Sequence, residues 1–456
     1  MKQLSLFLIT IFITSASFAQ TAQWTSLFDG KTLKGWVQKG GKAGYKVENG
    51  AIVGTSVANT SNSFLCTEKG YDDFILELEL SVDDNLNSGI QIRSQTKEGF
   101  NNGNVFGWQI EIDPSARAWS GGIYDEARRG WLYIPNINPA GQKAFKTKEQ
   151  WNKYRIEAIG NTCRTWINGV PVAYLVDTLM EKGIIGLQVH AVGKPEDVGR
   201  KVRWRNIRIQ TGKAMKPSPP DDCPVQNMAL NTLTDQEKKQ GWKLLFNGKD
   251  LNNWHTAFKT TAPTEGWSVN DGILKIQGSD GSESRTFGDI LTNEKFKAFE
   301  LTFEFKLTEG ANSGIKYFVD EKYDSKGGSA IGLEYQLLDD ERHPDAKLGA
   351  VGNRTLASLY DLIPSYKQEP RFQRKIGDWN YGRIVVLPNN IIQHWLNGFK
   401  VLEYERGSNI YKALVARSKY EQWGDEFGMA ESAPILLQDH GNTVYFKNLK
   451  IKELGN

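Results

Sequence analysis

The chain has 456 residues, of which 39% are hydrophobic and 24% are charged. This composition excludes a disordered chain, and the length suggests two or three domains. The net charge of +3, without a basic block, argues against nucleic acid as the main partner. The 45 glycines follow no collagen-like period, so they indicate many turns between short strands.

The first 19 residues are predicted to be a secretory signal peptide. Lys2 supplies the positive charge, residues 4–13 form a short apolar core, and Ser17-Phe18-Ala19 ends it with small residues before a cleavage point after Ala19. No cysteine follows directly, and no later apolar run approaches the ~20 residues of a membrane span. We therefore expect an exported protein, periplasmic or extracellular, without a membrane anchor.

An internal repeat is the strongest signal in the sequence. Trp24–Trp36 (WTSLFDGKTLKGW) returns as Trp242–Trp254 (WKLLFNGKDLNNW). Residues 44–54 and 266–276 each predict a hairpin around an Asn-Gly or Asp-Gly turn, and 74–80 and 299–305 alternate as strands. Later matches are NSGI (87–90, 312–315), Gly107 and Gly332, Trp-Asn (151–152, 379–380), Trp-x-Asn-Gly (166–169, 395–398), Gln-x-His (188–190, 438–440) and Asn-(Ile/Leu)-x-Ile (206–209, 448–451).

These ordered matches predict two homologous domains, at 22–212 and 240–456, joined by a linker at 213–239. The prolines after Lys216 predict an extended linker, and 233–241 predicts a short helix capped by Thr234. Within each domain, strands alternate with turns and helical periodicity is almost missing. The sequence therefore predicts an all-β protein of two tandem sandwich (jelly-roll) domains, without a dinucleotide-binding unit.

The LF-(D/N)-GK-x-L-x-x-W opening, the NSGI strand, the Trp-x-Asn-Gly turn and the Gln-x-His strand resemble the domain long called DUF1080. It is now described as a 3-keto-disaccharide hydrolase domain with a concanavalin-like lectin/glucanase fold. The resemblance covers nearly all of the chain after the signal peptide, once per repeat. It implies a 3-keto oligosaccharide or glucoside as substrate, and a functional link to a sugar 3-oxidoreductase.

Each repeat carries one carboxylate and one amide two residues apart on a strand, in exchanged order. Gln109 precedes Glu111 in the first repeat, and Glu334 precedes Gln336 in the second. Residues i and i+2 of a strand share a face, so each pair can bind sugar and exchange protons. The alternative is a solvent-facing polar stripe.

Only five histidines occur, and two occupy matching positions, His190 and His440. Each follows a glutamine by two residues, Gln188 or Gln438, so the histidines are candidate general bases with the glutamines as sugar ligands. Asp439, beside His440, joins the catalytic candidates. The alternative is a structural histidine bonded to the backbone, which we expect for the unmatched His255 and His394.

Other polar and aromatic residues complete the candidate site. Asp339 and His343 could hold a divalent cation such as Ca, Mn or Mg, or form a charged surface turn. An insertion at 409–431 places Tyr411, Tyr420 and Trp423 in an aromatic lid over a sugar or in a plain surface loop. The remaining candidate sugar ligands are Arg93, Tyr124, Arg128, Tyr360 and Asp361.

The resemblance implies chemistry at a C3 ketone, which acidifies the C2 hydrogen. A base removes that proton, the C1 substituent leaves, and water adds to the enone. We expect His440 or His190 as the base and Glu334 or Glu111 as the acid, with the second repeat favoured. A two-carboxylate glycosidase, a pair of carbohydrate-binding modules and a structural protein are the alternatives.

Overall fold

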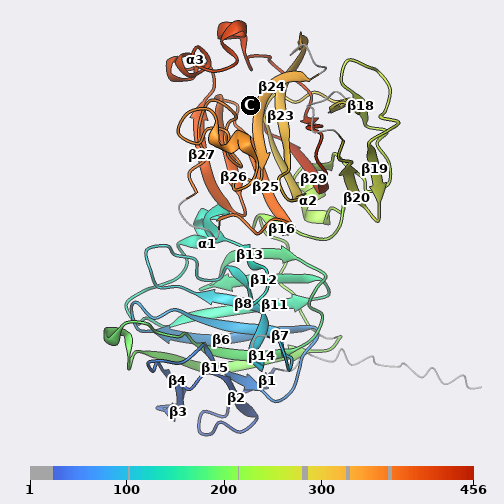
Figure 1. Cartoon of the computed structure of the whole chain (residues 1–456). Coiled ribbons are helices and arrows are strands. Elements are labelled where there is room, and N and C mark those ends of the chain that lie inside the picture. Colours follow the sequence, from blue (N-terminus) through green and yellow to red (C-terminus); the bar gives the residue numbers. More distant parts are fainter. Residues whose placement is uncertain are drawn as a thin grey trace, which may run out of the picture.

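The computed structural model describes residues 24–100, 103–213, 215–279, 286–324, 329–367 and 372–455. The expected signal peptide lies outside them. The described chain forms two β domains stacked end to end, the first blue to green and the second yellow to red (Figure 1). The predicted all-β fold is confirmed. No helix in these ranges is long and apolar enough to cross a membrane.

The first domain packs two sheets face to face. The nine-stranded sheet has the order β16-β13-β12-β11-β6-β15-β4-β3, with β1 beside β15, and the seven-stranded sheet has the order β10-β9-β8-β7-β14-β5-β2. The larger sheet comprises β1 (Thr25–Ser26), β3 (Gly44–Glu48), β4 (Ala51–Thr55), β6 (Phe74–Val82), β11 (Asn152–Ile159), β12 (Thr162–Ile167), β13 (Val170–Val176), β15 (Lys201–Thr211) and β16 (Val225–Asn227). The smaller comprises β2 (Trp36–Gly40), β5 (Ser63–Thr67), β7 (Ser88–Thr96), β8 (Val105–Ile112), β9 (Ile123–Glu126), β10 (Gly130–Tyr133) and β14 (Ile184–Val189).

The second domain repeats this arrangement with fewer strands. Its eight-stranded sheet has the order β19-β20-β29-β22-β25-β26-β27, with β17 beside β29, and its five-stranded sheet has the order β18-β21-β28-β23-β24. The larger sheet comprises β17 (Trp242–Leu244), β19 (Trp267–Asn270), β20 (Ile273–Ile276), β22 (Phe299–Leu307), β25 (Asn380–Val386), β26 (Ile391–Leu396), β27 (Phe399–Glu405) and β29 (Val444–Glu453). The smaller comprises β18 (Trp254–Thr256), β21 (Ile290–Thr292), β23 (Asn312–Asp324), β24 (Ala330–Leu338) and β28 (Leu436–Leu437).

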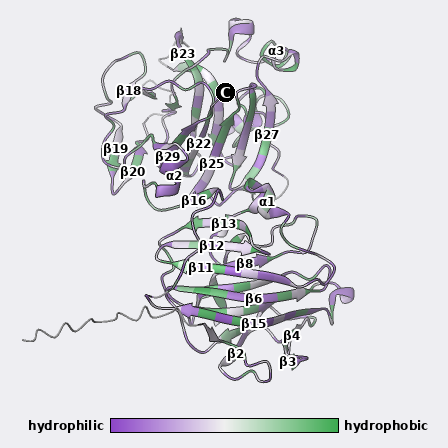
Figure 2. Ribbon diagram, turned by 180° about the vertical axis from the view of Figure 1, so that it is seen from behind, coloured by the Kyte–Doolittle hydropathy of each residue, from purple (hydrophilic) through white to green (hydrophobic). Residues whose placement is uncertain are grey.

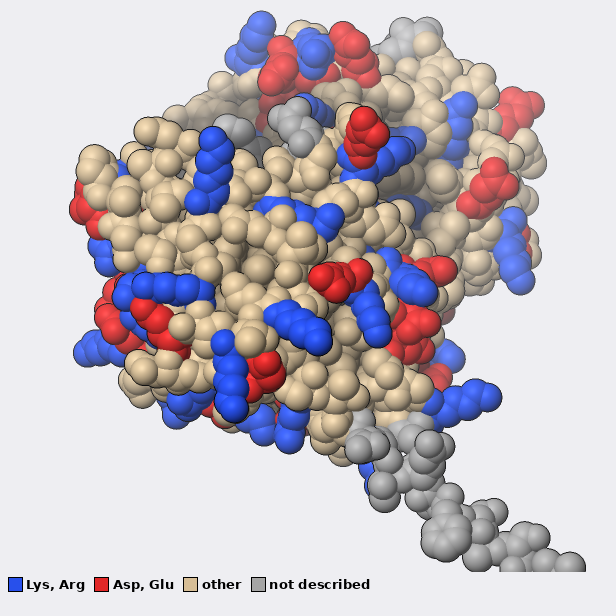
Figure 3. Space-filling model, turned by 90° about the horizontal axis from the view of Figure 1, so that it is seen from below, with Lys and Arg blue, Asp and Glu red and all other residues tan. Residues whose placement is uncertain are grey.

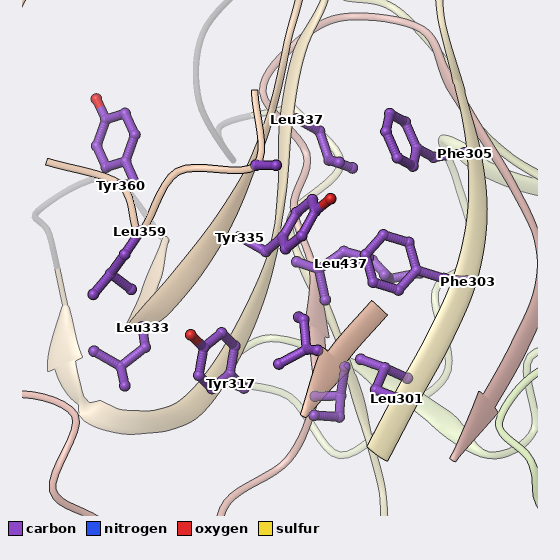
Figure 4. Packing of buried hydrophobic residues seen from close by; sticks show 14 of the residues in the cluster. Leu301, Phe303, Phe305, Tyr317, Leu333, Tyr335, Leu337, Leu359, Tyr360 and Leu437 are labelled. Atoms are coloured by element: carbon purple, nitrogen blue, oxygen red, sulfur yellow. The ribbon is translucent and has the colours of Figure 1, made fainter. Parts of the chain in front are cut away.

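Period-two alternation builds the core of the second domain. Leu301, Phe303 and Phe305 point from β22 toward Tyr335 and Leu437 on the facing sheet, and all five are buried (Figure 4). Ribbons coloured by hydropathy alternate along the strands of both domains (Figure 2). Each buried large side chain contributes about 1.5–3 kcal/mol of transfer free energy, which holds the two sheets together.

The Trp-x-Asn-Gly turns and the tryptophans that end the opening motifs have the same conformation or hydrogen bond in both repeats. Asn168-Gly169 and Asn397-Gly398 have positive φ at both positions, as a type I′ hairpin requires. Trp36 Nε1 donates to Leu27 O at 2.8 Å, and Trp254 Nε1 donates to Leu245 O at 3.0 Å. The last tryptophan of the opening motif therefore makes the same hydrogen bond to the backbone of that motif in both repeats.

The segment between the domains is more structured than an extended linker. β16 joins the first domain's large sheet, parallel to β13. The predicted helix is α2 (Asp235–Lys239), and Thr234 and Glu237 close a capping box at its start. The other helices within the described residues are α1 (Pro139–Gln142), α3 (Asn409–Val415) and short 3₁₀ turns at Pro135–Ile137, Pro195–Asp197, Pro344–Lys347 and Glu421–Glu426.

The two domains contact each other through the Trp-x-Asn-Gly turn of the second. Phe399 lies with its ring 5.6 Å from that of Trp119, and Asn136 Nδ2 donates to Gly398 O at 2.8 Å. The far end of the first domain instead carries basic and acidic side chains interspersed (Figure 3). The turn motif thus serves the domain contact as well as its own hairpin.

Candidate functional site

One face of the five-stranded sheet gathers the predicted residues of the second repeat. Gly314 lies opposite Gln336, and Lys316 lies opposite Glu334, across β23 and β24. Leu333, Tyr335 and Leu337 alternate with them into the core, so Glu334 and Gln336 share the other face, as their spacing predicts. They are only 4% and 1% exposed, which excludes a solvent-facing polar stripe.

A glycine creates the space that Glu334 occupies. A Cβ built on Gly314 would lie 2.1 Å from Glu334 Oε1, so the carboxylate side chain lies across that glycine. In the first repeat, a Cβ on Gly89 would lie 2.3 Å from Gln109 Cδ. The NSGI motif therefore needs glycine in both repeats because a neighbouring polar side chain covers it.

Both repeats pair their carboxylate with an amide. The hydrogen bonds of the Gln336 amide are satisfied when its nitrogen donates to Glu334 Oε1 at 3.2 Å and to Ser313 O at 3.0 Å. In the first repeat, Gln109 Nε2 donates to Glu111 Oε2 at 3.0 Å. The same hydrogen bond is thus kept although the order of the two residues is exchanged.

The segment directly after β28 brings a glutamine and a histidine close to this sheet. Gln438 N donates to Gly314 O at 3.0 Å, so Gln438 and Gln336 lie on opposite sides of Gly314 in the sheet. His440 follows two residues later, and its ring lies 6.0 Å from that of His343, at 87°. Burial, and then the neighbouring His440, lower the pKa of His343, which keeps this imidazole neutral at pH 7.

A chain of ion pairs fixes the loop that borders the site. Tyr360 N donates to Glu334 O, and its hydroxyl donates to Asp345 Oδ2 at 2.8 Å. Arg354 bonds both Asp345, at 3.0 Å, and Asp361, at 2.6 Å. Burial raises the pKa of Tyr360 well above its usual range, so the phenol stays protonated.

The insertion at 409–431 packs against this loop. Lys419 N donates to Asp361 Oδ2 at 2.8 Å, and Lys419 Nζ lies 4.2 Å from the Tyr360 ring centre. Tyr411 and Tyr420 are buried, whereas Trp423 is partly exposed. Of the three aromatic residues in the predicted lid, only Trp423 has surface to offer a ligand.

In the first repeat, the carboxylate is held by its own domain. Asn87 donates to Glu111 Oε1 at 2.6 Å, and Arg117 forms an ion pair with the same oxygen at 3.3 Å. Burial nevertheless raises the pKa of Glu111 to about 7. His190 Nδ1 lies 2.7 Å from Ala191 O, which is the backbone contact expected of a structural histidine. Gln188 is fully buried and pairs with Gly89 of the neighbouring strand β7.

Several predicted ligands do not lie at either site. Arg93 adopts φ +47° at a bulge, which breaks the alternation and sends its buried guanidinium to Asp72 O at 2.7 Å and to Asp73 at 2.8 Å. Arg128 forms an ion pair with the buried Asp125 at 2.5 Å. The two arginines therefore stabilise the first domain. Tyr124 differs from them, because it pairs with Gln109 across β8 and β9 and so lies on the candidate face of the first repeat, where its ring contacts that of Trp131.

Two aspartates of the second repeat also have structural partners. Asp439 accepts the backbone N–H groups of Phe287 and Gly288, at 3.2 and 3.1 Å, and so fixes the loop before β21. Asp361 joins Arg354 to Lys419, as described above. The tertiary contacts of these carboxylates therefore assign them to loop positioning.

The predicted cation ligands do not form a metal set. Asp339 accepts Gly310 N at 2.8 Å and forms an ion pair with Arg342 at 3.4 Å, while His343 Nδ1 accepts Asp345 N at 3.2 Å. Within the described ranges, no three His, Cys, Asp or Glu side chains come together as a metal site. Both residues are instead used to close the 339–348 loop.

The sequence did not point to Lys316 or to the Arg354 network. Lys316 is 2% exposed, and its ammonium donates to Ser329 Oγ at 2.7 Å and lies 3.9 Å from Asp289. The first repeat has Gln91 at this position. The only available signal was a charged residue inside an apolar strand, between Ile315 and Tyr317.

Comparison with known proteins gives two sequence matches. A family model described as a 3-keto-alpha-glucoside-1,2-lyase-like domain matches residues 23–210 and again 241–452. The 3-keto-disaccharide hydrolase of Bacteroides thetaiotaomicron is 36% identical over 233 residues, which are 47% of this chain and 79% of that protein.

Two of the solved structures that resemble the chain match over 50% and 39% of its length. A candidate glycosyl hydrolase from Parabacteroides distasonis is 30% identical, has a TM-score of 0.42, and matches over 50% of this chain and 100% of its own. A carbohydrate binding module from Bacillus subtilis is 17% identical, with a TM-score of 0.28, over 39% of this chain and 96% of its own.

Proposed function

Because the chain belongs to the 3-keto-alpha-glucoside-1,2-lyase-like domain family, matched by both repeats, we propose that it is a carbohydrate-active enzyme whose second repeat cleaves 3-keto-glycosides. The observation that carries this proposal is the buried face that Glu334 and Gln336 share, with the buried Gln438 beside Gly314 of the same sheet and the half-buried His440 two residues further along the chain. That face combines a carboxylate, two amides and a half-buried imidazole, which are the groups that acid–base cleavage requires.

The reaction starts at the C2 hydrogen, which the neighbouring C3 ketone makes acidic. His440 removes this proton, and the C2–H electron pair forms the enolate. The enolate then expels the C1 substituent, and Glu334 protonates the departing oxygen. Water then adds to the enone: its oxygen bonds C1 while Glu334 takes a proton from it, and protonated His440 returns a proton to C2, which restores both groups and gives the free 3-keto sugar. Each proton transfer by a positioned side chain contributes about 10²–10⁴-fold in rate.

The amide of Gln438 stabilises the enolate by a hydrogen bond in a site shielded from water. The Gln336 amide, whose two N–H groups face Glu334 and Ser313, orients the acid instead. Both side chains are at most 2% exposed, and the Gln336 nitrogen faces Glu334. Tyr360, Arg354 and Asp345 position the bordering loop, and Trp423 offers an apolar ring to the sugar.

The first repeat is the weaker catalytic candidate. Its Glu111 already accepts hydrogen bonds from Asn87, Gln109 and Arg117, and His190 is bonded to a backbone carbonyl. We assign it an accessory role, in which it supports the second repeat or holds a glycan without cleaving it.

The substrate chemistry also implies a supplier and a location. A glucoside acquires a C3 ketone only by oxidation of its C3 hydroxyl, so a sugar 3-oxidoreductase must act first. We propose that the protein meets this product after export, in the periplasm or outside the cell.

Exchange of each histidine for alanine tests the assignment. In His440→Ala, turnover of a 3-keto-glucoside should fall by at least about 10²-fold. The matched variant His190→Ala should keep wild-type turnover, because that ring contacts the backbone carbonyl of Ala191. Full activity in His440→Ala would refute the proposed base.

A further inference from the structure

A cavity of about 460 Å³ lies between the two domains, away from the proposed active site. Its walls come from three parts of the chain: Trp131 and Ile134 of the first domain, β16 with α2, and the outer face of the eight-stranded sheet. The proposed active site is on the other sheet of that domain. This volume is within the range of small-ligand sites.

Aromatic rings and amides line this cavity together. Trp131, Trp242 and Trp395 come from β10, β17 and β26, and each is partly exposed. Gln226 and Gln240 add side-chain amides that are likewise only partly buried. Flat apolar rings beside hydrogen-bonding amides suit a molecule with C–H faces and hydroxyl edges, which is the chemistry of a sugar.

The charged groups in the walls are mostly neutralised by each other. Glu300 forms ion pairs with Arg383 at 2.7 Å and with Lys452 at 3.1 Å. Lys450 forms an ion pair with Glu237 at 3.0 Å. Asp222 lies exposed at the rim.

Arg374 is the exception among these cations. Its guanidinium donates to the backbone carbonyls of Trp379, at 2.9 Å, and Trp131, at 3.4 Å. It forms no ion pair with a residue that the structure describes. Burial lowers its pKa, and the carboxylates of Glu304, Asp378 and Asp125 act in the opposite direction without forming an ion pair with it. A partly buried guanidinium without a carboxylate partner favours an anionic ligand, because planar bidentate pairing with a carboxylate is its strongest interaction.

We propose that this inter-domain cavity binds a small carboxylated carbohydrate of one or two sugar units, with its carboxylate on Arg374 and its ring among the tryptophans. The site is separate from the cleavage site and does not depend on the proposed reaction. Occupation would join both domains and α2 through one ligand.

Calorimetric titration of the full-length protein tests this, with D-glucuronate as the probe and D-glucose and inorganic phosphate as comparisons. We expect saturable binding of glucuronate, at least tenfold weaker binding of glucose and phosphate, and at least tenfold weaker glucuronate binding in Arg374→Gln. Because Arg374 also bonds the backbone, Trp242→Ala on another wall provides a second variant, and it should weaken glucuronate binding as well.

A variant of the cleavage site serves as the positional control. Glu334→Gln should bind glucuronate like the wild type, since Glu334 lies on the five-stranded sheet and the cavity is lined by the eight-stranded sheet. Absence of glucuronate binding, equal binding of phosphate, full binding in both cavity variants, or loss of binding in Glu334→Gln would overturn the proposal.

Discussion

Replacement of Gly314 by alanine should disable the proposed active site with one methyl group. The new Cβ would lie 2.1 Å from Glu334 Oε1, 2.8 Å from Cδ and 2.9 Å from Cγ. The first distance is about 1 Å below the shortest contact that real Cβ atoms make, so the carboxylate must move by about that much. Such a displacement of a catalytic group costs on the order of 10²-fold in turnover, and overpacking costs ~1–3 kcal/mol of unfolding free energy.

Gly89→Ala is the matched control in the first repeat. Its Cβ would lie 2.3 Å from Gln109 Cδ and 2.5 Å from Cγ, so its stability cost should be similar. Neither glycine has a left-handed φ, so the methyl group is the only change. Turnover of a 3-keto-glucoside and urea unfolding would be measured for both variants. Wild-type turnover in Gly314→Ala, or an equal loss in Gly89→Ala, would refute the assignment of catalysis to Glu334 and the second repeat.

Three further predictions concern titration, thiols and export. Burial raises the pKa of Glu111 to about 7, whereas an unfolded glutamate titrates near 4.5. The native state therefore holds a proton that the unfolded chain releases. The stability that this proton contributes is present below about pH 4.5 and is lost as the pH rises through 7. In urea unfolding, Glu111→Gln should remove up to about 3 kcal/mol of this pH dependence of the unfolding free energy. An unchanged dependence of the unfolding free energy on pH would contradict the burial argument. Burial also raises the pKa of all three cysteine thiols to about 12, so a thiol reagent at pH 8 should find none in the native protein and three after unfolding, and a fast native thiol would be the contrary result. Mass spectrometry of the exported protein should place its first residue at Gln20, directly after the predicted cleavage point; an intact N-terminus would contradict the signal peptide.

The repeat and its local turns were predictable because they depend on short-range chemistry. Asn-Gly dipeptides specify hairpins, alternation specifies which strand face is buried, and a repeated motif makes each signal appear twice. The family resemblance rested on these same motifs and is confirmed by the match over both repeats. The exchanged Gln109–Glu111 and Glu334–Gln336 pairs also followed from spacing alone.

The remaining features depend on contacts between distant segments. Period two places Arg93 on the candidate face, but a bulge with φ +47° turns it into the domain interior. Asp439 and Asp339 look free in sequence, yet each accepts backbone N–H groups from another segment. The buried position of Lys316 and the inter-domain cavity could not be predicted for the same reason, since both environments form only when separate strands and domains come together.

Release of the aglycone by the wild-type protein from a 3-keto-glucoside, measured beside the unoxidised parent glucoside, tests the central claim most directly. The proposed chemistry needs the C3 ketone to acidify the C2 hydrogen, so release should occur from the keto substrate alone. Equal release from the parent would indicate an ordinary glycosidase, and saturable binding of the keto substrate without release would indicate a carbohydrate-binding protein; either result would contradict the account.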